Sequence, residues 1–172
     1  DEPGSGGVPP LAEMLGALED MRREGMLEYI GLSNASRVHV EQALELVPVA
    51  AVQNRYSVVD REYDDVLELC RERGLAFVPF FPLGSAFTGG PAKLAADPAI
   101  AGTAQKHGAT PSQVALAWLL RRDEHILLIP GTSSVAHLEE NLGAIDVELD
   151  DADMATLEDV EPAGDQLQAL HD

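Results

Sequence analysis

Short apolar runs alternate with segments of helical periodicity along most of the chain. The apolar runs cover residues 27–32, 49–52, 75–81 and 126–130. In the segments between them, apolar residues recur every three or four positions, which predicts helices. Uninterrupted apolar runs of this length are typical of parallel strands that helices cover on both faces. The pattern therefore predicts an α/β fold with parallel strands.

Local start and stop signals place further helices. A helical stripe over residues 11–23 ends near Gly25, which suits a helix C-terminus. Thr110 followed by Pro111 and Gln113 predicts a capping box at the start of a helix that buries Trp118. Asp150 can cap a last, acidic helix that runs to residue 160.

The region between the third apolar run and the capping box is less regular. Residues 86–98 are rich in Gly, Pro, Ala and Asp, which favours a long, mobile loop that closes over a ligand. We expect residues 100–107 to form a short helix.

Polar side chains follow the predicted strands. Ser33 and Asn34 end the first run, Gln53 ends the second, and Ser85 follows the third. The carboxyl ends of parallel strands are where ligands of α/β folds bind, so these residues predict a shared pocket. Phe80 lies at the end of its run, where the ring could stack on a planar ligand, although an aromatic residue in a strand is more often part of the core.

The stretch 126–141 combines an apolar run, a Pro-Gly turn and a helix start. Thr132, Ser133 and Ser134 precede a helical stripe that carries Val135 and Leu138. Backbone N–H groups and hydroxyls at the N-terminus of a helix can hold an anion such as a phosphate. A capped turn without any ligand is the more common case, and the pattern alone leaves both interpretations open.

The charge balance excludes some partners. The 172 residues contain 30 acidic and 11 basic side chains, for a net charge of -19. This field repels nucleic acids and anionic membranes, so we expect no nucleic-acid partner. A phosphorylated cofactor would be repelled as well, and would have to rely on local dipoles and hydroxyls.

The remaining composition argues against several other classes of protein. No apolar stretch approaches the roughly 20 residues of a membrane span, and no secretory signal precedes the first helix. The single cysteine, Cys70, lies on an apolar helical stripe and is expected in the core, which fits a cytoplasmic location. The five histidines show no metal-ligand spacing, and the acidic run after Asp150 is typical of a solvated helix start rather than a metal site.

We expect three segments. Residues 1–10 form an N-terminal loop, residues 11–161 form the folded domain, and residues 162–172 form a loosely held tail. The Gly/Pro-rich opening, which lacks Met, suggests the middle of a longer protein.

Several motifs together resemble the aldo-keto reductase family, over about residues 11–160. Within the family, the longer match at residues 78–84 and 128–138 resembles the bacterial branch that includes pyridoxal reductases. The motifs that carry the resemblance are Ile30-Gly31-Leu32-Ser33-Asn34, Val52-Gln53-Asn54-x-Tyr56-Ser57, Pro82-Leu83-Gly84-Ser85, Pro111-x-Gln113-Val114-Ala115-Leu116-Ala117-Trp118, Ile129-Pro130-Gly131 and Glu140-Asn141.

The resemblance implies a fold and a cofactor. The family fold is a (β/α)8 TIM barrel, of which this chain resembles the C-terminal half, strands five to eight with their helices. The family binds NADP(H) at the carboxyl ends of its strands, and NAD(H) is an alternative here. The cofactor-binding positions implied by the resemblance are Ser33, Asn34 and Gln53 for the nicotinamide carboxamide, Phe80 for the nicotinamide ring, Leu83 and Ser85 for the pyrophosphate, Thr132, Ser133 and Ser134 for the adenosine phosphate, and His137, Glu140 and Asn141 for the adenine end.

Two departures from the family pattern qualify this expectation. Gly131 and His137 stand where many members have Lys and Arg, which puts the preference for NADP over NAD in doubt. The catalytic Asp, Tyr, Lys and His of the family lie on the first four strands and have no match here, so we expect no turnover by this chain alone.

Two functions remain open at this point. The chain could be the cofactor-binding half of a reductase that takes a small carbonyl substrate when the N-terminal half is supplied. Alternatively, it could be a non-catalytic truncated remnant, or a nucleotide-binding or interaction module that works as a half-barrel. An isolated half-barrel exposes two sheet edges, which favours self-association.

Overall fold

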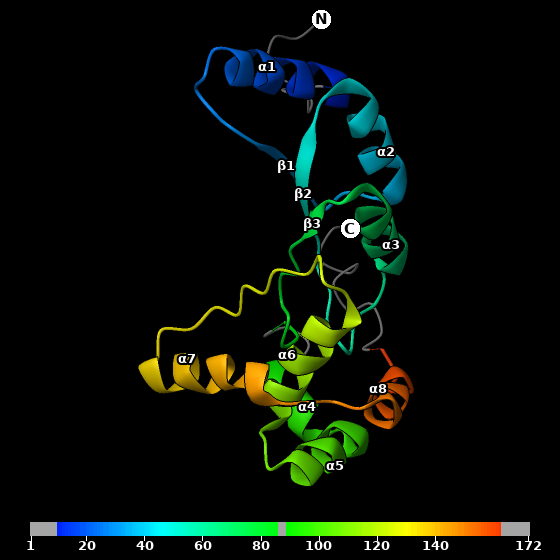
Figure 1. The fold of residues 1–172 in the computed structure, drawn as a ribbon, viewed down its shortest axis with the longest axis vertical. Helices are drawn as coiled ribbons and strands as arrows, with labels where there is room; N and C mark the ends of the chain where they lie inside the picture. The colour runs from blue at the N-terminus through cyan, green and yellow to red at the C-terminus, as the bar shows by residue number, and fades with distance from the viewer. Residues whose placement is uncertain (1–9, 86–88, 163–172) are drawn as a thin grey trace, which may run out of the picture.

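The computed structural model describes residues 10–85 and 89–162, so the expected loop at 1–9 and tail at 163–172 lie outside it. Three strands alternate with helices as far as β3, and only helices follow among the described elements; the eight α-helices and three strands form an elongated molecule (Figure 1). The elements are α1 Leu11–Arg23, β1 Ile30–Ser33, α2 Arg37–Leu46, β2 Val49–Gln53, α3 Asp64–Arg73, β3 Ala76–Phe77, α4 Gly90–Ala96, α5 Pro98–His107, α6 Pro111–Arg122, α7 Val135–Leu142, the 3-10 helix η2 Gly143–Asp146 and α8 Asp151–Glu158.

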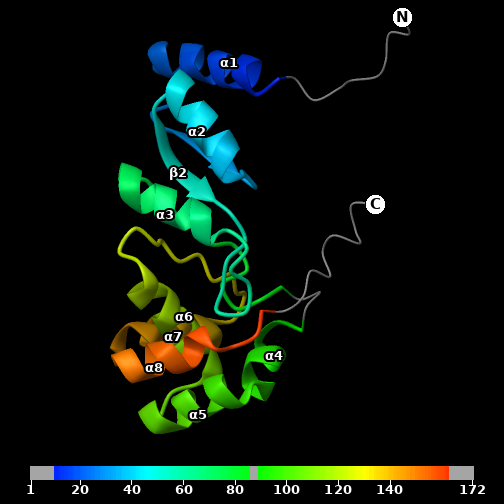
Figure 2. The same cartoon turned by 90° about the vertical axis from the view of Figure 1, so that its right-hand side faces the viewer.

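The strands form one parallel sheet in the order β1-β2-β3, which confirms the predicted α/β class. Helices α2 and α3 lie together on one side of it (Figures 1 and 2). The residues that point toward these helices, among them Ile30, Val52 and Phe77, are fully or almost fully buried. Gly31 and Ala51, which alternate with them, lie at the more open face of the sheet. Among the described elements, helical cover is therefore concentrated on one face.

Two of the four predicted strands are shorter than expected. The run 75–81 forms strand pairs at Ala76 and Phe77, and its pairing with the β2 segment continues only as an isolated bridge between Arg55 and Phe80 in the described chain, before Phe81 adopts a positive φ of 55°. The run 126–130 forms a single bridge, between Ile126 and Phe77, and no strand. Beyond this bridge the chain leaves the short β3, so no neighbouring backbone is available to extend the ladder.

The prediction of a long loop over residues 86–98 was wrong for its described part. Residues 90–96 form α4, and α5 starts at Pro98 rather than at residue 100. The side chain of Asp97 accepts hydrogen bonds from the backbone N–H groups of Ala99 and Ile100, so it caps α5. An Asp-Pro pair is a helix start signal that the loop-like composition concealed.

Both predicted capping signals are confirmed. Thr110 and Gln113 form a capping box at the start of α6, and Asp150 and Asp153 form one at the start of α8. The acidic run is nevertheless not merely solvated, because Asp153 is buried and accepts a 2.7 Å hydrogen bond from Lys106. Burial raises the pKa of Asp153, but the hydrogen bonds from Lys106, the Asp150 backbone and His107 outweigh it and hold the pKa well below its ordinary value.

An aromatic stack joins the sheet to α6. The ring of Tyr56 stacks on Trp118 with centroids 6.0 Å apart and meets Phe77 edge-on at 5.5 Å. All three side chains are fully buried, as is Cys70 on α3, so the core positions predicted for Trp118 and Cys70 are confirmed.

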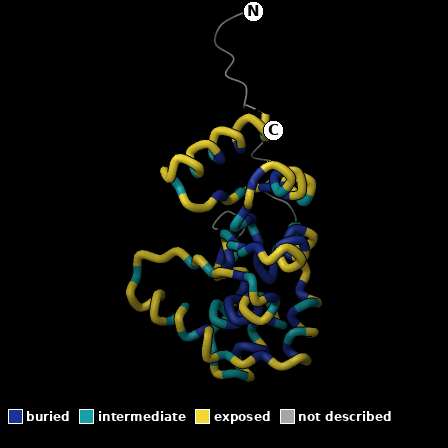
Figure 3. The backbone as a smooth tube through the Cα atoms, turned by 45° about the horizontal axis from the view of Figure 1, so that its top comes forward, coloured by how far each residue is buried: buried dark blue, intermediate teal, exposed yellow. Residues whose placement is uncertain are grey.

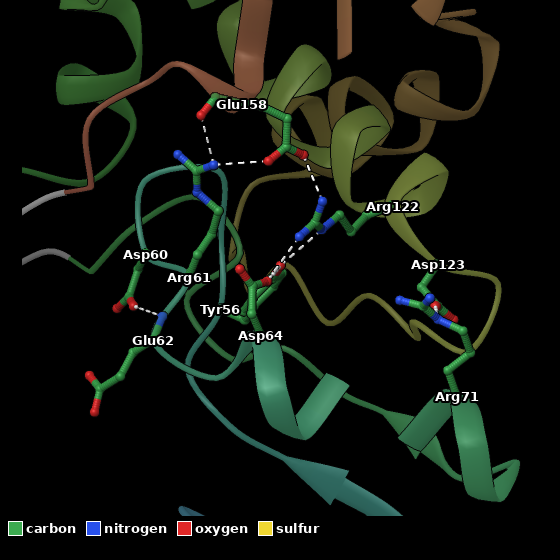
Figure 4. Close-up of polar contacts among 9 residues, drawn as sticks. All are labelled: Tyr56, Asp60, Arg61, Glu62, Asp64, Arg71, Arg122, Asp123 and Glu158. Atoms are coloured by element: carbon green, nitrogen blue, oxygen red, sulfur yellow. Dashed lines mark hydrogen bonds and ion pairs between the residues drawn. The ribbon is translucent and has the colours of Figure 1, made fainter. Parts of the chain in front are cut away.

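Arg122, at the end of α6, connects three helices through polar contacts (Figure 4). Its guanidinium donates to Asp64 at the start of α3 at 3.0 Å, and to Glu158 at the end of α8 at 2.7 Å. It also donates to the hydroxyl of Tyr56 at 3.1 Å, and this hydroxyl in turn donates to Asp64. Arg61 approaches Glu158 from the other side at 3.0 Å. One cation therefore links α3, α6 and α8.

Burial is uneven along the molecule. Figure 3 shows buried backbone concentrated around the sheet and α6, whereas α1 and α7 are largely exposed. None of the eight residues of α7 is buried. Large apolar side chains between the fourth apolar run and η2 are exposed: Leu127, Ile129, Val135, Leu138, Leu142 and Ile145.

We expect Arg122→Gln to lower the free energy of unfolding by about 2–3 kcal/mol, because two carboxylates and a buried hydroxyl lose their shared donor. Urea unfolding followed by circular dichroism measures this. The matched control is Arg121→Gln, since among the described residues Arg121 pairs only with the exposed Asp151; it should cost less than about 0.5 kcal/mol. Equal losses in the two variants would contradict a central role for Arg122.

Candidate functional site

Ser33 and Gln53 end two neighbouring parallel strands and lie side by side in the ladder. The backbone N–H of Asn34 donates a 3.0 Å hydrogen bond to the carbonyl of Gln53, so the turn after β1 is held against the end of β2. Asn34 has a positive φ of 52°, a left-handed conformation that Asn tolerates better than most residues. The structure thus brings these three predicted site residues together.

Asn54, which follows Gln53, holds the turn between β1 and α2 in place. Its side chain is fully buried, accepts a hydrogen bond from the Ala35 N–H at 3.0 Å and donates one to the Ala35 carbonyl at 2.8 Å. These two hydrogen bonds to Ala35, which lies in the turn between β1 and α2, fix the position of that turn relative to the end of β2. Sequence reasoning gave Asn54 no role, although an amide directly after a buried strand was the signal.

A hollow of about 330 Å³ lies on the open face of the sheet. Among the described residues, the side chains of Ser33 and Gln53 make no hydrogen bond, and Ser33 is exposed. A hydroxyl and an amide can both donate and accept, so they are free to bind a group that needs both. The residues that line the hollow are Gly31, Leu32, Ser33, Ala51, Gln53 and Val78.

The third predicted part of the site follows β3. Phe80 is anchored by its backbone, whose N–H donates to the Asn54 carbonyl at 2.9 Å, and its half-buried ring meets Phe81 edge-on at 5.1 Å. Leu83 is also half-buried. Ser85 is only 4% exposed, so its side chain is the least accessible of these positions.

The second group of predicted residues surrounds the N-terminus of α7. Ser134 caps the helix by accepting from the His137 N–H at 3.4 Å, and the hydroxyl of Thr132 accepts from the Ser134 N–H at 3.1 Å. Thr132, Ser133 and His137 are exposed, as an anion site at a helix start requires.

Glu140 and Asn141 lie in the last turn of α7 and are half-buried. The hydroxyl of Thr110 donates a 2.7 Å hydrogen bond to Oε1 of Glu140, so one carboxylate oxygen is already engaged by the protein.

The two groups are separated in the structure. In both side views α7 lies well below β1 and β2 along the long axis (Figures 1 and 2). The structure therefore assembles the group at Ser33, Asn34 and Gln53 and the group at Thr132–His137 individually, but does not bring them to one pocket.

Two kinds of feature are absent from the described residues, a cluster of metal ligands and a helix that could span a membrane. No group of three or more His, Cys, Asp or Glu side chains in them is placed to hold a metal ion. None of their helices combines the length and the apolar character that crossing a bilayer requires.

Comparison with known proteins decides the family. The model of the aldo/keto reductase family matches residues 6–162. The chain belongs to the aldo/keto reductase family. Among curated relatives, pyridoxine 4-dehydrogenase of Escherichia coli is 42% identical over 146 residues, which cover 85% of this chain and 49% of that protein. This similarity confirms the expected likeness to the bacterial pyridoxal-reductase branch.

Solved structures of the family support the fold. A thermostable aldo-keto reductase in complex with the inhibitor epalrestat matches with a TM-score of 0.75 and 34% identity, over 87% of this chain and 54% of the other. An aldo-keto reductase from Klebsiella pneumoniae in complex with NADPH matches with a TM-score of 0.78 and 28% identity, over 93% of this chain and 57% of the other. The expected partial barrel is confirmed, and the chain spans about half the length of the curated relatives it matches.

We expect Asn54→Ala to lower the free energy of unfolding by about 1–3 kcal/mol, because the N–H and carbonyl of Ala35 would lose their partner in a buried turn. The neighbouring Gln53→Ala, whose side chain makes no protein hydrogen bond in the described part of the chain, should change stability by less than about 0.5 kcal/mol. Thermal unfolding of both variants measures the difference. A destabilised Gln53→Ala with an unaffected Asn54→Ala would reverse the assigned roles.

Proposed function

We propose that this chain is the dinucleotide-binding half of an NAD(P)H-dependent aldo-keto reductase, which reduces small aldehydes or ketones to alcohols when the other half of the barrel is supplied. The observation that carries the proposal is the pair Ser33 and Gln53 at the carboxyl ends of adjacent parallel strands, beside an open hollow. Membership of the family and a solved relative in complex with NADPH support the choice of ligand.

The residues present fit the nicotinamide end of such a cofactor. A carboxamide needs both an acceptor and a donor, and the side chains of Ser33, Asn34 and Gln53 supply both. Phe80 supplies a half-exposed aromatic ring near the end of the next strand, suited to stacking on a flat ring. When bound, the reduced cofactor supplies the hydride.

This chain is not expected to supply the general acid that the carbonyl oxygen requires. Tyr56 is buried, and its hydroxyl already donates to Asp64. Burial, together with the hydrogen bond to Asp64, raises the pKa of Tyr56 far above its ordinary value, which makes it a poor proton donor at neutral pH. Proton delivery is therefore assigned to the half of the barrel that this chain lacks.

The adenosine end favours a cofactor without a 2′-phosphate. The sequence between Arg122 and residue 172 contains no Lys or Arg, so the segment of the exposed turn at Thr132–Ser134 itself offers hydroxyls, backbone N–H groups and the helix dipole. Two carboxylates, Glu139 and Glu140, follow on the same helix. A helix terminus contributes about 0.3–1 kcal/mol toward one anion at an exposed site, which is little for a phosphate that carries up to two charges.

We predict that the chain binds NADH more tightly than NADPH, and that His137→Arg narrows or reverses the difference by adding a permanent cation beside the turn. Titration followed by cofactor fluorescence gives both dissociation constants. Because Arg acts through charge, its gain for NADPH should shrink as the salt concentration rises. His137→Gln serves as the uncharged control. Tighter NADPH binding by the unaltered chain would overturn this preference.

Two backbone edges, at the fourth apolar run and at β1, are available for pairing with another chain. Beyond Ile126 the backbone of the fourth apolar run has no strand neighbour in the described part of the chain, and β1 pairs only with β2. Leu127 and Ile129 are 56% and 43% exposed at that edge. We propose that these edges take up a complementary half-barrel, or a second copy of this chain where the complementary half is lacking.

Mixing this chain with the unmatched N-terminal part of the E. coli pyridoxine 4-dehydrogenase is expected to give aldehyde-dependent oxidation of the reduced cofactor, tested with pyridoxal among other aldehydes. Neither part alone should turn over. The mixture with Gln53→Ala should need more cofactor, which separates true assembly from contaminating activity. Turnover by this chain alone would disprove the proposal that the other half of the barrel supplies the general acid. If this chain remained a monomer at high concentration, self-association would be ruled out.

A further inference from the structure

Helix α7 carries three of the twelve proposed cofactor positions, and three more lie in the turn before it, but the helix has almost no apolar anchorage. None of its eight residues is buried, and its apolar side chains Val135, Leu138 and Leu142 are 72%, 48% and 65% exposed. Apolar burial is normally what holds a surface helix to its domain. Another interaction must therefore fix the direction in which α7 points.

Polar contacts from the start of α6 fix the direction of α7. The Thr110 hydroxyl donates to Oε1 of Glu140 at 2.7 Å, and Nε2 of Gln113 donates to the backbone carbonyl of Glu140 at 2.9 Å. The same two residues form the capping box of α6, through Thr110 N–H to Gln113 Oε1 at 3.0 Å and Gln113 N–H to the Thr110 hydroxyl at 3.2 Å. Each capping side chain thus bonds its own helix start and the last turn of α7.

A larger residue at the end of α7 would fit only if the side-chain amide of Gln113 moved away. A Cβ added at Gly143 would lie 2.6 Å from Nε2 of Gln113. Gly143 has a φ of -63°, which any residue can adopt, so the reason for glycine here is the approach of the Gln113 amide rather than backbone conformation.

We infer that Thr110 and Gln113, seated against Gly143, form a clamp that positions α7 and orients the carboxylate of Glu140. The clamp engages Oε1 and leaves Oε2 without a protein hydrogen bond among the described residues. Oε2 can then accept from an N–H donor, and the exocyclic amine of adenine is such a donor. The second part of this inference rests on the proposed function, whereas the clamp itself does not.

Hydrogen exchange tests the clamp without any ligand. Thr110→Val and Gly143→Ala should each raise the exchange of the amides of residues 136–142 by about tenfold, the effect of losing one hydrogen bond to a charged or well-aligned partner. Amides of α3 should be unaffected. Thr110→Ser, which keeps the hydroxyl, should behave like the unaltered chain.

If Thr110→Val unfolds α6, Gly143→Ala still tests the clamp, because this substitution displaces the Gln113 amide and leaves Thr110 unchanged. Its matched control is Gly102→Ala on α5, where an added Cβ would meet no atom within 4 Å. Unchanged exchange over residues 136–142 in Gly143→Ala would overturn the clamp.

Base discrimination tests the orientation of Glu140. The unaltered chain should bind NADH more tightly than its hypoxanthine analogue, which carries a carbonyl in place of the amine, and Thr110→Val should bring the ratio of the two dissociation constants close to one. A ratio that Thr110→Val leaves unchanged would overturn the positioning role. If the unaltered chain bound neither dinucleotide, the proposed function would fail, and exchange would still decide on the clamp.

Discussion

The parallel pairing of β1 with β2 determines the geometry on which the rest of the structure depends. This register sets Ser33 beside Gln53 and places Asn34 within reach of the Gln53 carbonyl. Asn54 then ties the following turn to the same edge through two bonds to Ala35. These bonds are made by buried groups, and a buried donor or acceptor left unpaired costs more than an exposed one. The proposed ligand edge is therefore held in place by the same kind of backbone and buried hydrogen bonds as the sheet that carries it.

The sheet itself is complete on one side only. Helices α2 and α3 bury Ile30, Val52 and Phe77, while the other face carries the hollow. After Phe77 the pairing with the β2 segment continues as an isolated bridge at Phe80. A strand is defined by its neighbours, and residues 126–130 have one neighbour for a single bridge. Their apolar character is that of a buried strand, yet Leu127 and Ile129 are exposed, as are the apolar residues Val135, Leu138 and Leu142 of α7.

The sequence predicted those features that depend on local physics. The capping boxes at Thr110 and Asp150 lie where the short-range signals placed them, and the alternation of apolar runs identified the parallel sheet. Features that depend on distant residues could not be read in this way. The length of a strand depends on its partners, and the engagement of Glu140 by Thr110 joins residues thirty positions apart. The start of α5 at Asp97 was local and readable, but the surrounding Gly, Pro and Ala obscured it.

The two ends of the proposed cofactor site are held by different forces. The nicotinamide end lies on a hydrogen-bonded sheet with a buried support, where the polar groups are pre-positioned before any ligand arrives. The adenosine end lies on a helix that two side chains of α6 hold by polar contacts. Polar contacts at a partly exposed site are weaker than a packed core, because water competes for every donor and acceptor. The adenosine end is therefore the part of the proposed site whose position depends on the fewest contacts. Because a dinucleotide is an extended molecule, the two groups can hold its opposite ends without sharing one pocket, and the contacts of Thr110 and Gln113 with Glu140 then set where the adenosine end lies.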